Sequence, residues 1–198
     1  MEKEKIEELK TKLFNKRDNG WLTIKSKDDV FEYAKGYIDY MNKAKTEREI
    51  IKQSKKIAEE NGFNNIEEIE SLKPGDKVYY VNREKSMYLA IVGKESAENG
   101  INIIGAHADS PRLDLKPNPL YEDGELAYFK THYYGGIKKY QWTTIPLSIH
   151  GVIVKANGEK IEVNIGEDEN DPIFTITDLL PHLAQDQMEK KLKNGIEG

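Results

Sequence analysis

Between Gly105 and Pro117 the sequence reads GAHADSPRLDLKP and contains the residues best suited to chemistry. His107 and Asp109 stand two positions apart, and on an extended backbone residues at this spacing point the same way. Asp109 is then expected to stay close to the His107 imidazole and to orient it, as nearby carboxylates do for metal-bound histidines. The pair could therefore take part in a metal site. The alternative, which the two residues alone favour, is an ordinary loop histidine beside a turn aspartate.

The chain contains no cysteine, so a thiolate metal site and a disulfide framework are both excluded. His, Asp and Glu must then hold any bound metal, and such ligands suit zinc, manganese or cobalt. His182 lies in the run LPHLA, near the start of an expected helix, where a histidine on the face of the helix is the simplest expectation. His132 and His150 lie in β-like runs, where packing or surface roles are expected.

The elements that must position these residues follow from the pattern upstream. An apolar run from Ile101 to Ala106 comes directly before His107 and predicts a strand buried on both faces. His107 would then lie at the carboxyl edge of a sheet, where open α/β sheets build their sites. Earlier in the chain, helical periodicity follows capping patterns at 26–29 and 46–49, and two strands are expected at 77–83 and 87–92. Helices followed by a buried strand indicate an α/β fold.

The character of the sequence changes after Pro117. Segments at 126–134, 145–154, 160–165 and 173–176 are β-rich, are separated by Gly, Asn, Asp and Pro, and predict a small antiparallel sheet or barrel. Thr177 is expected to cap a last helix from Asp178 to Lys193, with Pro181 in its tolerated first turn. The domain boundary is therefore expected at 116–123, giving domains of residues 1–117 and 118–198.

Composition narrows the class of protein. The net charge of −5 argues against binding to nucleic acid or to anionic lipid. A hydrophobic fraction of 37%, with 11 Tyr and 5 Phe, is enough to form a packed core. The N-terminus lacks the apolar stretch of a signal peptide, and no apolar run approaches the roughly 20 residues of a spanning helix. The expectation is a soluble, cytoplasmic protein with no nucleic-acid or membrane partner.

Three segments carry a resemblance to a known family. They are the run from His107 to Pro117, the sequence KTHYYGG at 130–136, and the region 173–184 with its core DLLPHLA. In these segments, and in their order along essentially the whole chain, the sequence resembles the aspartyl aminopeptidase family of cocatalytic zinc metallopeptidases. The resemblance implies the N-terminal part of an α/β zinc-peptidase domain, followed by an incomplete β-rich dimerisation domain.

The same resemblance implies the chemistry. His107 is expected to bind one of two metal ions, and Asp109 is expected to support it as an active-site residue. The family's enzymes remove N-terminal residues, often acidic ones, from peptides and form large homo-oligomers. Two divalent ions about 3.5–4 Å apart would polarise the scissile carbonyl and activate a bridging water. The last helix is expected to carry His182 towards the active site of a partner subunit, where His182 would bind metal or instead contact substrate.

The chain also departs from the family pattern. Several residues of the family's site are expected downstream of the residues present. They are the bridging Asp, the Glu-Glu pair that contains the general base, a further Asp ligand and a C-terminal His. The Glu pairs at 59–60 and 67–68 are interpreted as solvated surface. Asp186 stands where related sequences often carry a second His, and the segment 139–144 replaces a Trp-x-x-Trp-x-Asp-Arg-like run, so a preference for acidic residues is not carried over.

The preferred hypothesis is a metal-dependent aminopeptidase that is active only with the missing C-terminal part. The alternative is a non-catalytic oligomerisation or binding module derived from such a peptidase. A different metallohydrolase that uses the His-x-Asp pair is a third hypothesis, and the extent of the family resemblance weakens it.

Overall fold

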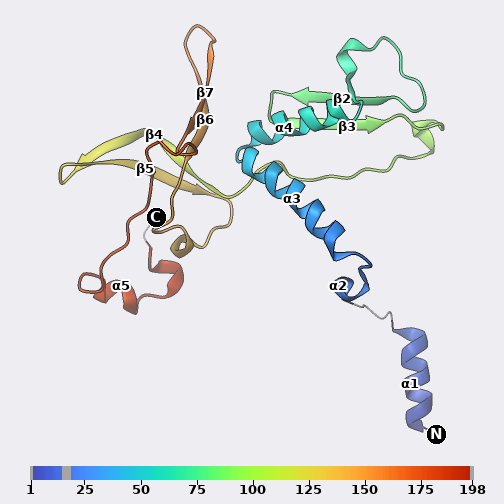
Figure 1. Ribbon diagram of the computed structural model, residues 1–198, viewed down its shortest axis with the longest axis horizontal. Helices are drawn as coiled ribbons and strands as arrows, with labels where there is room; N and C mark the ends of the chain where they lie inside the picture. Colours follow the sequence, from blue (N-terminus) through green and yellow to red (C-terminus); the bar gives the residue numbers. More distant parts are fainter. Residues whose placement is uncertain (1, 15–18, 197–198) are drawn as a thin grey trace. The chain divides into compact units, whose positions relative to one another are not determined.

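The computed structural model describes residues 2–14 and 19–196. The chain divides into two compact units, Met1–Asn42 and Lys43–Gly198. The first unit is helical, with α1 (Glu2–Leu13), α2 (Gly20–Thr23) and most of α3 (Lys27–Lys43) (Figure 1). The backbone N–H of Asp29 donates to the Ser26 hydroxyl at 3.3 Å, so the capping pattern predicted at the start of α3 is present.

Helix α4 (Glu47–Glu60) begins the second unit, and its start is fixed by the predicted capping box. The Thr46 side chain accepts from the Glu49 backbone N–H, and the Glu49 carboxylate accepts from the Thr46 backbone N–H at 2.9 Å. The helix ends at Asn61, and Gly62 follows with φ 81°, a left-handed conformation that glycine adopts without strain. The capping pattern at 46–49 therefore predicted the start of this helix correctly.

A three-stranded sheet packs against α4. Its order is β1 (Asn64–Asn65), β2 (Lys77–Asn82) and β3 (Ser86–Ile91), with β1 parallel and β3 antiparallel to β2. Helix α4 lies against the β2–β3 hairpin (Figure 1). The buried side chains there are Ile51 and Ala58 from the helix and Val78 and Tyr79 from β2. The two strands predicted at 77–83 and 87–92 are therefore confirmed, and they give the molecule its mixed α/β character.

The strand predicted from Ile101 to Ala106 is wrong. The structure has no strand between residues 100 and 111, and Ile101, Ile103 and Ile104 are exposed by 68%, 78% and 98%. A strand buried on both faces needs a hydrogen-bonding neighbour on at least one side and a covering layer on each face. None of the described residues provides either for this segment. The His107 motif therefore follows an exposed, extended segment rather than a formed sheet edge.

The next ribbon consists of β4 (Arg112–Asp123) and β5 (Leu126–Tyr134), which are antiparallel. Gly124 and Glu125 form the two-residue turn between them, with φ 57° and 64°. The register shifts between Leu115 and Leu120, where Pro117 and Pro119 lack the N–H groups that a regular ladder needs. The segment 116–123, expected to separate two domains, thus lies within β4. The division of the complete protein at residues 117 and 118 remains a prediction.

A second antiparallel ribbon is formed by β6 (Ile149–Val154) and β7 (Lys160–Ile165). Single bridges join Thr143 to Ile176 and Leu147 to Phe174. The predicted β-rich character is present, but the described part of the chain forms two separate two-stranded ribbons (Figure 1) and not a single sheet or barrel.

The long terminal helix predicted from Asp178 to Lys193 is also wrong. Between residues 178 and 194 the structure contains only α5 (Gln185–Glu189) and the short 3₁₀ turn η4 (Leu192–Asn194). Pro181 accounts for the late start, because a proline disfavours the helical conformation of the residue before it. Leu180 to Ala184 form an isolated turn instead, with Leu183 donating its N–H to the Leu180 carbonyl at 2.8 Å. Thr177 consequently caps no helix.

Candidate functional site

The loop that carries the His-x-Asp motif is tied to the start of α4. The Ser110 hydroxyl donates to the Lys45 carbonyl at 3.3 Å. The Arg112 guanidinium reaches further, donating from Nη1 to Glu47 Oε1 at 2.9 Å and from Nε to Asp114 Oδ1 at 2.7 Å. Arg112 therefore holds the loop between α4 and β4. Its guanidinium is engaged by two carboxylates, which argues against the possibility that it binds a substrate carboxylate.

Within this loop, His107 and Asp109 make the contact that their spacing predicts. His107 Nδ1 lies 2.9 Å from Asp109 Oδ1 and also 2.9 Å from the Asp109 backbone carbonyl oxygen. An ionised carboxylate and a carbonyl only accept hydrogen bonds, so Nδ1 must carry the hydrogen. In the neutral ring, Nε2 then has the free lone pair, and it makes no hydrogen bond to any of the described residues. The His107 side chain is 83% exposed, so this nitrogen is accessible.

Tyr134 completes the arrangement. Its hydroxyl donates to Asp109 Oδ2 at 2.8 Å, so the two carboxylate oxygens are held by different partners. The hydrogen bond from Tyr134, and then the one from His107, lower the pKa of Asp109 below its ordinary value. The same bond raises the pKa of Tyr134, because its proton is shared with a carboxylate. Asp109 is therefore an ionised acceptor near neutral pH, as an orienting carboxylate must be.

The pairing of β4 with β5 explains why Tyr134 lies here. Arg112, at the start of β4, is opposite Tyr134, at the end of β5, and its guanidinium lies 4.0 Å from the centre of the tyrosine ring. Gly135 follows with φ 77°, and a Cβ added to it would come within 3.5 Å of Pro111. The close approach of these two residues brings the end of β5 to the His-x-Asp loop. Sequence reasoning assigned Tyr134 only to the end of a strand, since the strand register was not readable.

These residues fit one ligand of a zinc site and not a whole site. Catalytic zinc commonly takes three protein ligands, and His107 Nε2 supplies one. No cluster of three or more His, Cys, Asp or Glu side chains suited to a metal occurs in the part of the chain that the structure describes. His182 lies in the exposed turn before α5 and makes no contact with His107. The structure thus brings together His107 and Asp109, and leaves His182 apart from them.

The remaining sequence candidates are at the surface. The Glu pairs at 59–60 and 67–68 are exposed, as expected, and Glu59 accepts a hydrogen bond from the Tyr79 hydroxyl at 2.7 Å. His132 is exposed and stacks on Tyr133, with ring centres 5.2 Å apart. Lys116 is exposed on β4. The expected surface role of His132 is confirmed.

His150 lies in a second cluster of charged side chains. The packing or surface role expected from the sequence did not include these charged partners. Its side chain is only 9% exposed. Nδ1 lies 2.8 Å from Glu49 Oε1, and Nε2 lies 3.0 Å from both Glu167 Oε1 and the Ser148 hydroxyl. A neutral imidazole donates from one nitrogen only, so carboxylates at both nitrogens suit the doubly protonated ring. The cluster joins the capping box of α4 to the β6–β7 ribbon.

The pKa values of both carboxylates, Glu49 and Glu167, are lowered. Burial by itself raises the pKa of Glu49, but the hydrogen bond and charge of His150, together with the bonds from Thr46, bring that pKa below its ordinary value of 4.5. For Glu167, the hydrogen bond from Ser148 is the largest influence, and with the bond from His150 it lowers the pKa despite partial burial. A carboxylate with a lowered pKa stabilises the fold above its unfolded pKa, and this contribution is lost as the pH falls through the folded value.

The His150→Ala variant should therefore lose about 1–3 kcal/mol of unfolding free energy near pH 7, because two partly buried carboxylates each lose one of their hydrogen bonds. The difference from wild type should shrink as the pH falls below about 4.5, where wild type loses the same contacts. Urea unfolding at a series of pH values measures both effects. Glu162→Gln is the matched control, since it breaks an exposed pair with Lys52 and should cost less than about 1 kcal/mol. Equal losses in both variants at pH 7 would contradict a special role for His150.

Comparisons with known proteins agree with this fold and motif. The family model described as aminopeptidase I zinc metalloprotease (M18) matches residues 40–197, so the chain belongs to the M18 aminopeptidase family. Probable M18 family aminopeptidases 1 from Borreliella afzelii and Clostridium acetobutylicum are each 50% identical to it, over 92% and 94% of this chain. The resemblance seen in the sequence is thereby confirmed.

Solved structures give the same answer. An M18 family aminopeptidase from Thermotoga maritima superposes with a TM-score of 0.83 at 45% identity, covering 93% of this chain and 40% of its own. Aminopeptidase I from Clostridium acetobutylicum gives a TM-score of 0.80 at 47% identity, covering 93% and 42%. The chain spans about 41% of the length of the curated relatives named above. Of the helices described, none is long and apolar enough to cross a membrane.

Proposed function

We propose that this chain is part of a longer metal-dependent aminopeptidase that removes N-terminal residues from peptides. The observation that carries the proposal is the tautomer imposed on His107. Asp109 holds the hydrogen on Nδ1 and leaves the Nε2 lone pair free and accessible. Membership of a zinc metalloprotease family supports zinc as the metal, with manganese or cobalt as alternatives.

In this proposal the residues of the chain bind and orient. His107 Nε2 would hold one of two zinc ions, and Asp109 would fix the orientation of the imidazole ring. Tyr134 holds the second oxygen of the Asp109 carboxylate by a hydrogen bond. Bound zinc supplies Lewis-acid polarisation of the scissile carbonyl and lowers the pKa of a bound water. The other ligands and the general base come from a part of the enzyme that follows this chain. The arrangement of Asp109 makes it a positioning residue, which acts through the imidazole.

We further propose that residues 118–198 belong to a dimerisation domain of a cytoplasmic homo-oligomer. Leu179, Leu180 and Leu183 are close to His182 in the sequence and are 53%, 67% and 72% exposed. Several large apolar side chains gathered on one exposed turn suit a protein interface. His182 at this turn is proposed to reach the active site of a partner subunit, as a contact to substrate or to metal.

The proposed function is tested by comparing the full-length protein with the 198-residue chain on an aminoacyl reporter. The full-length protein should lose activity to a chelator and regain it with zinc, manganese or cobalt. The isolated chain should show no turnover with any of these metals, because one ligand does not hold a cocatalytic pair.

Clear metal-dependent turnover by the isolated chain would contradict this division of the site. A full-length protein that remains inactive with every metal would instead favour the non-catalytic module.

A further inference from the structure

A pocket of about 550 Å³ lies between the end of β5 and the 3₁₀ turn η4, away from the residues proposed to bind metal. Its walls come from the segment that follows β5, including η3 (Lys139–Gln141), and from η4. The described residues that line it are Tyr133, Ile137, Lys138, Lys139, Tyr140, Leu192 and Lys193. Three of these seven carry a positive charge and none carries a negative one, in a chain whose net charge is −5.

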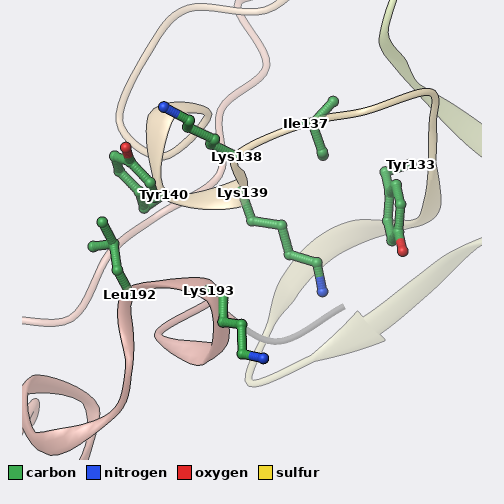
Figure 2. Close-up of a pocket in the computed structure, with 7 residues that line it drawn as sticks. All are labelled: Tyr133, Ile137, Lys138, Lys139, Tyr140, Leu192 and Lys193. Atoms are coloured by element: carbon green, nitrogen blue, oxygen red, sulfur yellow. The ribbon is translucent and has the colours of Figure 1, made fainter.

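Two of the lysines extend in similar directions. In Figure 2 the side chains of Lys139 and Lys193 both run towards the side of the pocket where Tyr133 lies, whereas Lys138 points the other way. Lys139 Nζ lies 5.3 Å from the centre of the Tyr133 ring. Neither Lys139 nor Lys193 pairs with a carboxylate among residues 2–14 and 19–196, whereas other lysines such as Lys52 and Lys160 do. Two cations that line one cavity repel each other, and an anion between them removes that cost.

The rest of the wall indicates what kind of anion fits. Ile137, Leu192 and the ring of Tyr133 offer apolar surface beside the two ammonium groups. Small-molecule sites combine such a largely apolar lining with a few polar groups that fix orientation. A fully hydrated inorganic anion gains nothing from this surface. A carboxylate attached to an apolar chain or ring uses both parts of the pocket.

The strand geometry separates this pocket from the candidate metal site. Tyr133 and Tyr134 are consecutive residues of β5, and consecutive side chains of a strand point to opposite faces. Tyr134 donates to Asp109, while Tyr133 lines the pocket. We infer that the chain has a second binding site here, for a small organic carboxylate with an apolar body, held by Lys139 and Lys193 against Tyr133. This site does not depend on the metal or on the proposed peptidase activity.

The test is calorimetric titration of the 198-residue chain with 4-phenylbutyrate at low salt, alongside the neutral 4-phenylbutyramide and inorganic phosphate. Phenylbutyrate should bind saturably, the amide and phosphate should bind at least about 10-fold more weakly, and added salt should weaken phenylbutyrate. Lys139→Gln and Lys193→Gln should each weaken binding about 3-fold, and the double variant about 10-fold.

Lys130→Gln is the matched control. Lys130 also lies over a tyrosine ring, with Nζ 5.1 Å from the centre of Tyr121, but it lines no part of the pocket. Binding should be unchanged in Lys130→Gln and in His107→Ala, and circular dichroism should show all variants folded. Absence of saturable binding, equal binding of the amide, preference for phosphate, or an unchanged affinity in the double variant would each overturn the inference.

Discussion

The His107→Ala variant of the full-length protein should lose most of one zinc ion per subunit, and its turnover should fall by more than about 100-fold. The reason is that His107 Nε2 is the accessible ring nitrogen that is proposed to bind metal, and loss of a direct ligand exceeds the roughly 10–100-fold cost of losing its support. Metal content and turnover on an aminoacyl reporter, measured on the same preparation, give both numbers.

The companion variant Asp109→Asn separates orientation from ligation. An amide keeps the size of the side chain, but its NH₂ group cannot accept from His107 Nδ1 or from Tyr134, so zinc affinity should fall by about 10–100-fold while the fold is kept. His132→Ala is the control, because His132 is exposed and touches Tyr133 without reaching the loop. Wild-type metal content and turnover in both His107→Ala and Asp109→Asn would mean that these two residues are an ordinary loop histidine and turn aspartate.

Replacing His182 with phenylalanine in the full-length protein should lower turnover by about 10–100-fold and leave metal bound at His107, because a group that positions substrate is lost without a change at the ligand. Mixing this variant with His107→Ala then tests where His182 acts. If His182 serves the partner's site, each mixed dimer has one site with both lesions and one intact site. Random exchange should then restore about a quarter of wild-type activity.

Subunit exchange must be shown separately, for example by mass spectrometry of differently tagged subunits. If subunits exchange but activity does not recover, His182 either acts in the active site of its own subunit or has no role in catalysis. Loss of metal in His182→Phe would identify His182 as a ligand rather than a contact to substrate.

Local signals allowed the best predictions of structure. The capping box of Thr46 and Glu49 set the start of α4, because it depends on residues within one turn. The hairpin β2–β3 followed from apolar strands around a short polar turn. The His107–Asp109 contact is of the same kind, since two positions on an extended backbone are enough to make it.

Elements that depend on distant partners were predicted less well. The apolar run from Ile101 to Ala106 has the composition of a buried strand, but pairing decides whether a strand forms, and no described segment pairs with it. The long helix predicted from Asp178 to Lys193 does not form. Pro181 disfavours the helical conformation of the residue before it, and the spacing of apolar residues does not take this effect into account.

Two contacts near the site could not be read from the sequence at all. Tyr134 reaches Asp109 only because Arg112 and Tyr134 are paired at one end of the β4–β5 ribbon, 22 positions apart along the chain. His150 meets Glu49 across 101 positions and Glu167 across 17. Such contacts require the register of strands and the packing of ribbons, and neither leaves a signal in local spacing.

The central claim is that His107 binds zinc through Nε2 while Asp109 holds Nδ1. A crystal structure of the zinc-loaded full-length protein, with anomalous diffraction recorded on both sides of the zinc edge, tests it most directly. A zinc peak is expected about 2.0–2.1 Å from His107 Nε2, with Asp109 still hydrogen-bonded to Nδ1. A zinc site that leaves the His107 ring uncoordinated, or coordination through Nδ1 with Asp109 displaced, would contradict it.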